Sequence, residues 1–393
     1  MKRNIKIALC LILSLFYTTQ IFTISALAED ENNDNKGIVV EAKSALLMEP
    51  SSGKIIYEKN SHEKFAPASV TKIMVMLLAM EAVDGGKIKL QDKITISENA
   101  KKMGGSSMIL DTGEIRTVEE ILKGIAIASG NDAAVAMAEY LGGNEGAFVS
   151  MMNERAKGLG MKDTAFRNCT GLSAEGHLTT AYDISIMSRE LLKHSKILKY
   201  SGTYMETISE GRKTPIGLVN HNKLVRFFDG CDGLKTGFTN EAKYCISATA
   251  VRSNVRMLAI IMGAPTYKII NNDASMLMNY GFTKFETKKV IAKGDELGNI
   301  PLNKRGDKFL IAKAQEDFNL TLERGSKNKI SKKFVVDKEL KEYKKDKAIG
   351  FCEIYVDSKL SGKVIIYSDR DIKKSGVMDN IKNNLLDLFD KAI

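Results

Sequence analysis

The chain has 393 residues, of which 44% are hydrophobic and 27% charged, and its formal net charge at pH 7 is +10. This length can bury a sizeable core and predicts two domains. The positive excess is modest and spread along the chain, without a basic stripe interleaved with aromatic residues. We therefore expect no nucleic-acid partner.

The first 28 residues predict export. Lys2, Arg3 and Lys6 precede an apolar run, and the Ala-Leu-Ala sequence at 26–28 has the small residues of a cleavage site. Polar residues at 17–20 interrupt the run before it reaches the roughly 20 apolar residues of a membrane-spanning helix. We expect a signal peptide over 1–28, not a retained anchor. The acidic, polar segment 29–37 then reads as a flexible leader.

The spacing Ser-x-x-Lys occurs four times, starting at Ser51, Ser61, Ser69 and Ser326. The first lies in a predicted hairpin turn, and the second and fourth lie in polar or charged stretches. Ser69 alone precedes an apolar run, "IMVMLLAMEAV", which predicts a buried helix. A serine and a lysine three residues apart on a helix share a face, so the amine of Lys72 can take the proton of the Ser69 hydroxyl. Burial would ease this by lowering the pKa of the lysine.

Further elements follow in order. The segment 117–141 predicts a helix that opens with a capping box, Thr117 to Glu120, and breaks at Ser129-Gly130-Asn131. A helix is expected over 179–194, then strands at "YCISATAV" and "RMLAIIMGA", and a helix ending near residue 282. Strands at both ends with helices between them predict a mixed α and β domain.

From about residue 286 the sequence changes to short apolar runs broken by Gly, Asp and Lys, which predicts a small all-β domain over 286–370. Residues 377–393 predict a terminal amphipathic helix. Two interpretations of this helix stay open: packing against the β domain, or docking on the outer face of the cytoplasmic membrane through its apolar face.

The remaining reactive side chains form no recognisable metal site. Four cysteines lie beyond the signal peptide without metal-ligand spacing, and we expect free, buried thiols. The histidines are separated and are interpreted as surface or turn residues, with His221 as an alternative cleft residue. Asp183 is expected to cap or brace its helix more than to act in catalysis. We expect neither a metal nor another cofactor.

Three motifs occur in a fixed order: Ser69-x-x-Lys72, Ser129-x-Asn131 and Lys235-Thr236-Gly237. Together they resemble the penicillin-recognising serine enzymes. The segments "APASVTKIM", "ASGNDAAVAMAE" and "DGLKTGFTNEAKYCISATA" are similar to the low-molecular-mass D-alanyl-D-alanine carboxypeptidases, peptidase family S11, over about residues 38–285. The resemblance implies an α+β (α/β) transpeptidase/β-lactamase-like catalytic domain with an antiparallel sheet flanked by helices.

The resemblance also implies roles for the catalytic residues. Ser69 is acylated by the penultimate D-alanine carbonyl, and Lys72 is its general base. Ser129 relays a proton to the departing D-alanine, and Asn131 orients the substrate amide.

For substrate binding, the resemblance implies that Lys235 and Thr236 hold the terminal carboxylate. The backbone N–H groups of Ser69 and Phe238 form the oxyanion hole that acyl transfer requires. From its residue type, Gly237 is expected to let a substrate backbone lie along the strand edge.

The chain departs from the family at two positions. Lys243 stands where the family often has glycine, and Ile270 stands where an arginine is common. Lys268 is a candidate replacement for that arginine, but it offers a point charge instead of a bidentate fork.

The expected function is removal of the terminal D-alanine from peptidoglycan stem peptides, which limits cross-linking, with covalent binding of penicillin. A serine β-lactamase is disfavoured because no Glu-x-x-Leu-Asn segment occurs between residues 140 and 185. Two alternatives stay open: a non-catalytic wall-binding or sensor protein, and a DD-endopeptidase.

Overall fold

The computed structural model describes residues 38–209, 211–301, 309–337, 340 and 342–373. The predicted signal peptide, the leader over 29–37 and the terminal helix over 377–393 lie outside these residues, so the structure does not test them. Among the described residues, no helix combines the length and apolar character needed to cross a bilayer.

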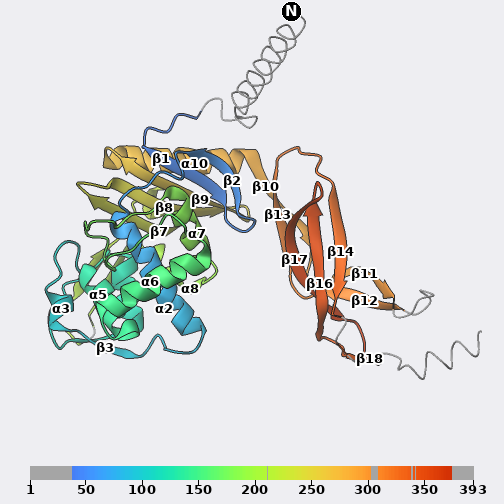
Figure 1. Cartoon of the computed structure of the whole chain (residues 1–393), viewed down its shortest axis with the longest axis horizontal. Helices are drawn as coiled ribbons and strands as arrows, with labels where there is room; N and C mark the ends of the chain where they lie inside the picture. Colours follow the sequence, from blue (N-terminus) through green and yellow to red (C-terminus); the bar gives the residue numbers. More distant parts are fainter. Residues whose placement is uncertain (1–37, 210, 302–308, 338–339, 341, 374–393) are drawn as a thin grey trace, which may run out of the picture. The chain divides into compact units, whose positions relative to one another are not determined.

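A five-stranded antiparallel sheet forms the centre of the first region (Figure 1). Its strand order is β2-β1-β9-β8-β7, so the last strand, β7, is an edge. The bounds are β1 (Ser44–Glu49), β2 (Lys54–Lys59), β7 (Cys231–Thr239), β8 (Lys243–Arg252) and β9 (Val255–Ala264). The predicted hairpin around residues 50–53 is confirmed, as are the two predicted strands that became β8 and β9.

Both faces of this sheet are covered, which explains why its central strands read as nearly continuous apolar runs. Alternate residues of β9 point to opposite faces: Leu258 and Ile260 belong to the main core, whereas Met257 packs against α10 (Tyr267–Lys284). The helix α10 ends at Lys284, close to the predicted end near residue 282. On the other face lie α2 (Lys72–Asp84) and α7 (Ala181–Leu191) (Figure 1).

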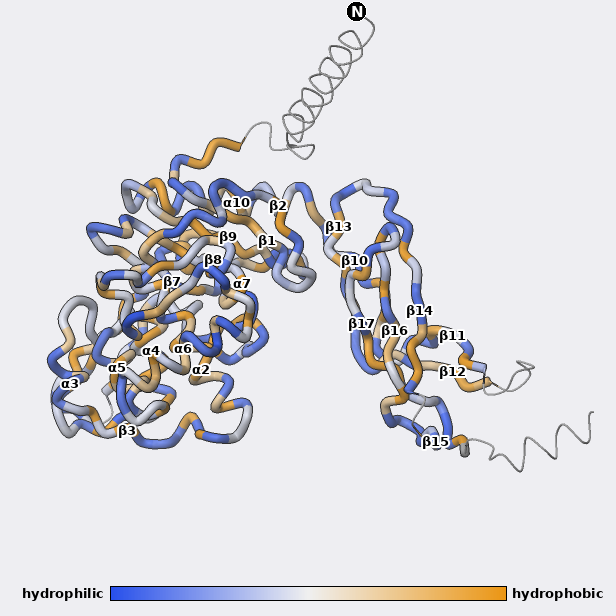
Figure 2. The backbone as a smooth tube through the Cα atoms, in the orientation of Figure 1, coloured by the Kyte–Doolittle hydropathy of each residue, from blue (hydrophilic) through white to orange (hydrophobic). Residues whose placement is uncertain are grey.

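Helix α2 is buried on nearly every side, as its composition predicts. Residues 73–77 are fully buried, and the tube around α2 is correspondingly hydrophobic in Figure 2. Each such aliphatic side chain contributes about 2 kcal/mol by leaving water. The helix therefore holds its first turn firmly inside the domain.

Most other helices of this region pack against α2 or against one another. Helix α4 (Val118–Ala126) carries the predicted capping box at Thr117 and Glu120, and the chain breaks before α5 (Asn131–Gly142), as expected. The remaining elements of this region are β3 (Lys93–Thr95), α3 (Glu98–Lys101), β4 (Ile115–Thr117), α6 (Glu145–Leu159), α8 (Lys196–Ser201), β5 (Met205–Ile208), β6 (Ile216–Val219) and α9 (Leu224–Phe227).

Described residues from 285 onward form an all-β region with two small apolar cores. A two-stranded sheet pairs β10 (Phe285–Ile291) with β13 (Phe318–Glu323). A five-stranded sheet has the order β11-β12-β17-β16-β14. Its strands, with the short pair that follows, are β11 (Glu296–Pro301), β12 (Phe309–Ala314), β14 (Ile330–Val336), β16 (Ala348–Val356), β17 (Lys359–Ser368), β15 (Glu342–Tyr343) and β18 (Ile372–Lys373).

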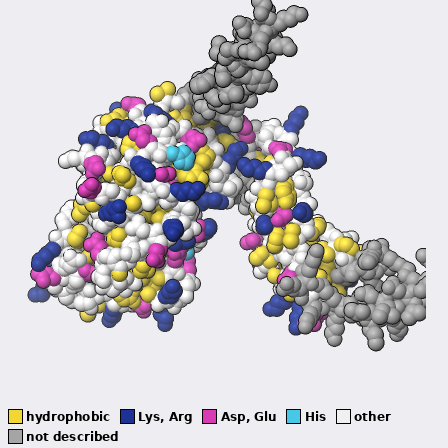
Figure 3. Space-filling view, in the orientation of Figure 1, with side chains coloured by type: hydrophobic (Ala, Val, Ile, Leu, Met, Phe, Trp, Pro, Cys, Tyr) yellow, Lys and Arg dark blue, Asp and Glu magenta, His cyan; other side chains and the backbone are white. Residues whose placement is uncertain are grey.

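Cationic and anionic side chains are intermixed on the face seen in Figure 3. All four described cysteines are free, and three of them are buried, as expected. Asp183 accepts hydrogen bonds from Asp163 N and Thr164 Oγ1, which confirms its bracing role.

Candidate active site

Ser69 lies on a 3₁₀ turn (Ala68–Thr71) that leads directly into α2, whose first residue is Lys72. The apolar helix buries this turn, so the Lys72 side chain is completely inaccessible to solvent while Ser69 stays partly exposed. The hydroxyl Oγ of Ser69 and the amine Nζ of Lys72 are 3.0 Å apart. Ser69 and Lys72 therefore share a face, as predicted, although the turn that carries Ser69 is a 3₁₀ turn, which is tighter than an α-helical one.

Two oxygen acceptors fix the amine of Lys72. Its Nζ donates to Asn131 Oδ1 and to the backbone carbonyl of Thr170, both at 2.6 Å. A neutral amine has two N–H bonds and one lone pair. When the two N–H groups point at these oxygens, the lone pair is left for the third neighbour, the Ser69 hydroxyl. The geometry suits proton abstraction from Ser69.

The surroundings also adjust the charge of Lys72. Burial lowers the pKa of its amine to about 7, and the nearby Cys169 and Asp132 oppose this only in part. A large fraction of the amine is therefore neutral at neutral pH, as a base requires.

The second motif forms the turn between α4 and α5. Ser129 has a left-handed backbone, with φ +60°, and its side chain is buried. Asn131 is anchored twice to a neighbouring loop: its Nδ2 donates to Gly104 O at 2.6 Å, and its N–H donates to Ser106 O at 2.7 Å. A left-handed non-glycine residue is strained and persists where surrounding contacts impose it.

The third motif lies on the edge strand β7. A Cβ atom on Gly237 would lie 2.8 Å from Ser69 N and 3.0 Å from Val70 N. This glycine is therefore needed for close approach of the Ser69 turn, a reason that differs from the expected one. Phe238, the next residue, is half exposed, and its ring packs on Tyr244.

Lys235 is almost completely buried, and its Nζ donates to Thr236 O at 2.8 Å. Burial and the charge of Lys72 hold the pKa of Lys235 well below its usual range. Two lysines that repel one another in a buried site favour an anionic ligand.

His221 belongs to this electrostatic environment. Desolvation and the charges of Lys235 and Lys72 lower the pKa of His221, although the residue as a whole is exposed. Its backbone carbonyl accepts a hydrogen bond from Tyr267 OH at 2.7 Å. The exposure of His221 agrees with the surface interpretation, and its cleft alternative stays a prediction.

Both family departures have structural consequences. The position where the family often has arginine is occupied by Ile270, whose side chain is buried in α10 and offers no guanidinium. Lys268, the candidate replacement, is exposed. Lys243 has a φ of +56°, a conformation that glycine adopts without strain.

His177 closes a turn, as one of its two interpretations predicts, with its N–H donating to Ala174 O at 3.0 Å, but the surface interpretation is wrong. It is buried, and its Nε2 lies 2.9 Å from the hydroxyl of Thr71, inside the Ser-x-x-Lys turn. The sequence also gave no prediction for the Thr170 carbonyl. The only signal was the "NCTGL" segment around it, because a backbone acceptor has no residue type of its own.

Comparisons with known proteins identify the family of this chain. A family model described as D-alanyl-D-alanine carboxypeptidase matches residues 29–266. The chain belongs to this family. A second model, described as the penicillin-binding protein 5 C-terminal domain, matches residues 285–374. The predicted family, fold class and serine carboxypeptidase class are confirmed.

Individual relatives of this carboxypeptidase span most of its length. D-alanyl-D-alanine carboxypeptidase DacF of Bacillus subtilis is 41% identical, over 93% of this chain and 95% of its own. The structure of penicillin binding protein 5 from Haemophilus influenzae is 29% identical, with a TM-score of 0.69, over 86% of this chain and 98% of its own. An ampicillin-bound structure of Listeria monocytogenes penicillin-binding protein D2 is 30% identical, with a TM-score of 0.57, over 63% of this chain and 99% of its own.

Proposed function

We propose that this protein removes the terminal D-alanine from peptidoglycan stem peptides through an acyl-enzyme on Ser69. The observation that carries the proposal is the amine of Lys72, held by Asn131 Oδ1 and Thr170 O with its third direction toward Ser69 Oγ. Family membership supplies the reaction class.

In the first step, Ser69 Oγ bonds to the penultimate D-alanine carbonyl carbon while its proton passes to Lys72 Nζ. The backbone N–H groups of Ser69 and Phe238 stabilise the oxyanion. The peptide C–N bond then breaks, and Ser129 relays the proton from Lys72 to the leaving D-alanine nitrogen. Water then attacks the ester carbonyl carbon while Lys72 accepts its proton. The bond between that carbon and Ser69 Oγ breaks, the proton passes from Lys72 to Ser69 Oγ, and the shortened stem peptide leaves with a new carboxylate.

Lys235 and Thr236 bind the terminal carboxylate of the stem peptide in this proposal, and Asn131 orients its amide. The position of Lys235 supports this role, since it is buried beside Thr236 on β7, next to the Ser69 turn. A bound carboxylate would favour its protonated form and so offset the desolvation that lowers its pKa. The same cationic site accommodates the carboxylate of a β-lactam, in line with the ampicillin complex of the Listeria relative.

Stem peptides lie outside the cytoplasm, so the proposal includes export. The predicted signal peptide over 1–28 would direct it, and the predicted helix over 377–393 would hold the protein at the outer face of the cytoplasmic membrane.

The test uses the purified protein and its Ser69→Ala variant, each exposed to a fluorescent penicillin. A peptide ending in D-Ala-D-Ala is supplied separately, and released D-alanine is counted. We expect stable labelling and release by the wild type and neither by Ser69→Ala. Ser326→Ala, with the same Ser-x-x-Lys spacing in a loop, should behave as the wild type.

Labelling without D-alanine release would contradict carboxypeptidase action. Because no arginine stands at Ile270, that outcome would point to a cross-link endopeptidase or a wall-sensing role. A wild type that takes no label would contradict the acyl-enzyme itself.

A further inference from the structure

The loop 104–111 lies beside the site and holds Asn131 in place by hydrogen bonds. Both anchors of Asn131, at Gly104 O and Ser106 O, come from this loop. The same asparagine receives a hydrogen bond from Lys72. A displacement of the loop therefore changes the direction of the Lys72 amine relative to Ser69.

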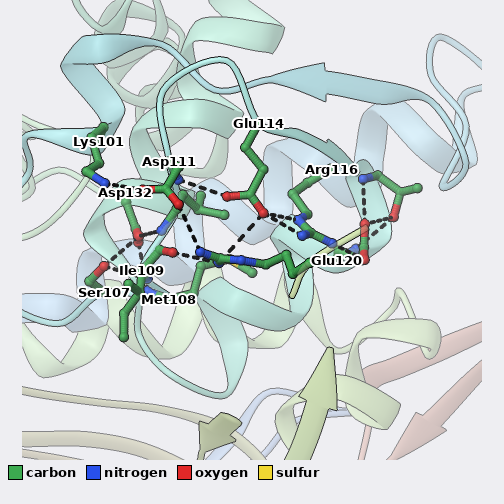
Figure 4. A network of polar contacts seen from close by, with 12 residues as sticks. Lys101, Ser107, Met108, Ile109, Asp111, Glu114, Arg116, Glu120 and Asp132 are labelled. Atoms are coloured by element: carbon green, nitrogen blue, oxygen red, sulfur yellow. Dashed lines mark hydrogen bonds and ion pairs between the residues drawn. The ribbon is translucent and has the colours of Figure 1, made fainter. Parts of the chain in front are cut away.

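Asp132 holds this loop from the α5 side (Figure 4). Its buried carboxylate accepts hydrogen bonds from Ser107 Oγ at 2.6 Å, Met108 N at 3.0 Å and Leu110 N at 3.1 Å. Ile109 joins this network only on its N–H side, where it donates to Ser107 Oγ at 2.7 Å. It is 69% exposed and has a φ of +61°. A left-handed conformation is a genuine outlier for a β-branched residue, so a contact on its carbonyl side must also hold it.

That contact comes from Arg212, which lies in the connection between β5 and β6. Its guanidinium donates to Ile109 O at 2.7 Å and to Asp111 Oδ2 at 3.1 Å, and Glu114 lies 3.6 Å away. Asp111 and Glu114 lie close together at the end of the loop (Figure 4). The planar fork of arginine can address a carbonyl and a carboxylate at once, which an ammonium group cannot do as well.

The segment that carries Arg212 is tied to the opposite wall of the site. Strand β6 runs into Asn220, His221 and Asn222, and Asn222 Nδ2 donates to Gly233 O on β7. Strand β7 carries Lys235-Thr236-Gly237. Arg212 thus connects the wall that holds Asn131 to the wall that binds the substrate carboxylate.

We propose that Arg212 is a positioning residue for acylation: it holds loop 104–111 in the conformation that places Asn131, and through it the Lys72 amine, against Ser69. The inference rests on the proposed function, because the reaction it supports is acylation of Ser69. The guanidinium touches neither Ser69 nor Lys72, and its effect passes through Ile109, the loop and Asn131.

The test measures the rate of acylation by a fluorescent penicillin across pH, together with the melting temperature. Arg212→Ala should lower the plateau rate about tenfold, because small misplacements of reacting groups have large kinetic effects. Arg212→Ala should also shift the pH range in which the acylation rate rises to higher pH. A loosened Asn131 admits water to Lys72, and burial is what lowers that pKa. The other charged or titratable groups around Lys72, namely Asp132, Cys169, Lys235 and His221, remain in place.

Two variants make the test independent of folding defects. Arg212→Lys should recover part of the rate, since it keeps the charge and one donor. Asp111→Asn leaves the guanidinium intact and should shift rate and pH profile in the same direction, and its effect should not add to that of Arg212→Ala.

Arg155→Ala is the matched control, because Arg155 pairs with Glu81 and Glu190 away from this loop. It should lower the melting temperature without moving the pH profile. Wild-type rate and pH profile in both Arg212→Ala and Asp111→Asn would overturn the inference. Failure of the wild type to take the label would instead refute the proposed function.

Discussion

The hydroxyl of Thr71 lies 2.9 Å from Nε2 of His177, a residue 106 positions further along the chain. The other ring nitrogen, Nδ1, accepts a hydrogen bond from Arg167 N at 3.0 Å. The network therefore assigns the proton of the neutral ring to Nε2, which donates to Thr71. This buried imidazole supports the turn that carries Ser69.

His177 makes the fold sensitive to acid. Burial lowers its pKa from 6.5 to about 4, so the folded state resists protonation while the unfolded chain accepts a proton below pH 6.5. Stability should thus fall as pH drops from 6.5 to 4, by about 3 kcal/mol in total from this residue. Urea unfolding across this range should show a flatter pH dependence in His177→Gln. An equally steep dependence in that variant would contradict the assignment.

The pH dependence of acylation should follow Lys72. Because its pKa is lowered to about 7, the reactive neutral form falls about tenfold for each pH unit below that value. The rate of penicillin labelling should rise through an apparent pKa near 7 and then level off. A flat profile between pH 5 and 8 would show that Lys72 is not the base.

Gly237→Ala tests the close contact between β7 and the Ser69 turn. The added methyl group would meet backbone atoms of Ser69 and Val70, which cannot rotate away. We expect acylation to fall about a hundredfold, because the turn must move by a fraction of an ångström or more, with circular dichroism unchanged. Gly217→Ala, on β6 with open space around it, is the matched control. Equal activity of the two variants would refute the steric role of Gly237.

Lys243→Gly should stabilise the protein. At a φ of +56°, a side chain costs about 1–2 kcal/mol that glycine avoids, less the extra entropy that glycine gives the unfolded chain. The melting temperature should rise by about 2 °C with unchanged acylation. Lys243→Ala removes the same charge but keeps Cβ, so it should show no such gain. If the alanine variant is stabilised equally, charge and not backbone strain is responsible.

Much of the site follows from local sequence rules. The Ser-x-x-Lys spacing before an apolar helix identified Ser69 and Lys72, since helical periodicity fixes which residues share a face. The capping box at Thr117 and the break at Ser129 were equally local, because caps and turns depend on residues three or four apart.

The contacts that prepare these residues for chemistry depend on the tertiary structure alone. The Thr170 carbonyl, the Gly104 carbonyl, His177 and Arg212 all act across long separations in the chain, and two of them are backbone groups that every residue possesses. Their roles come from the burial and direction that packing imposes. The sequence therefore determined the candidate reacting groups and the family, whereas the tertiary structure decided how the Lys72 amine is directed, because hydrogen-bond direction exists only between groups that the fold has brought together.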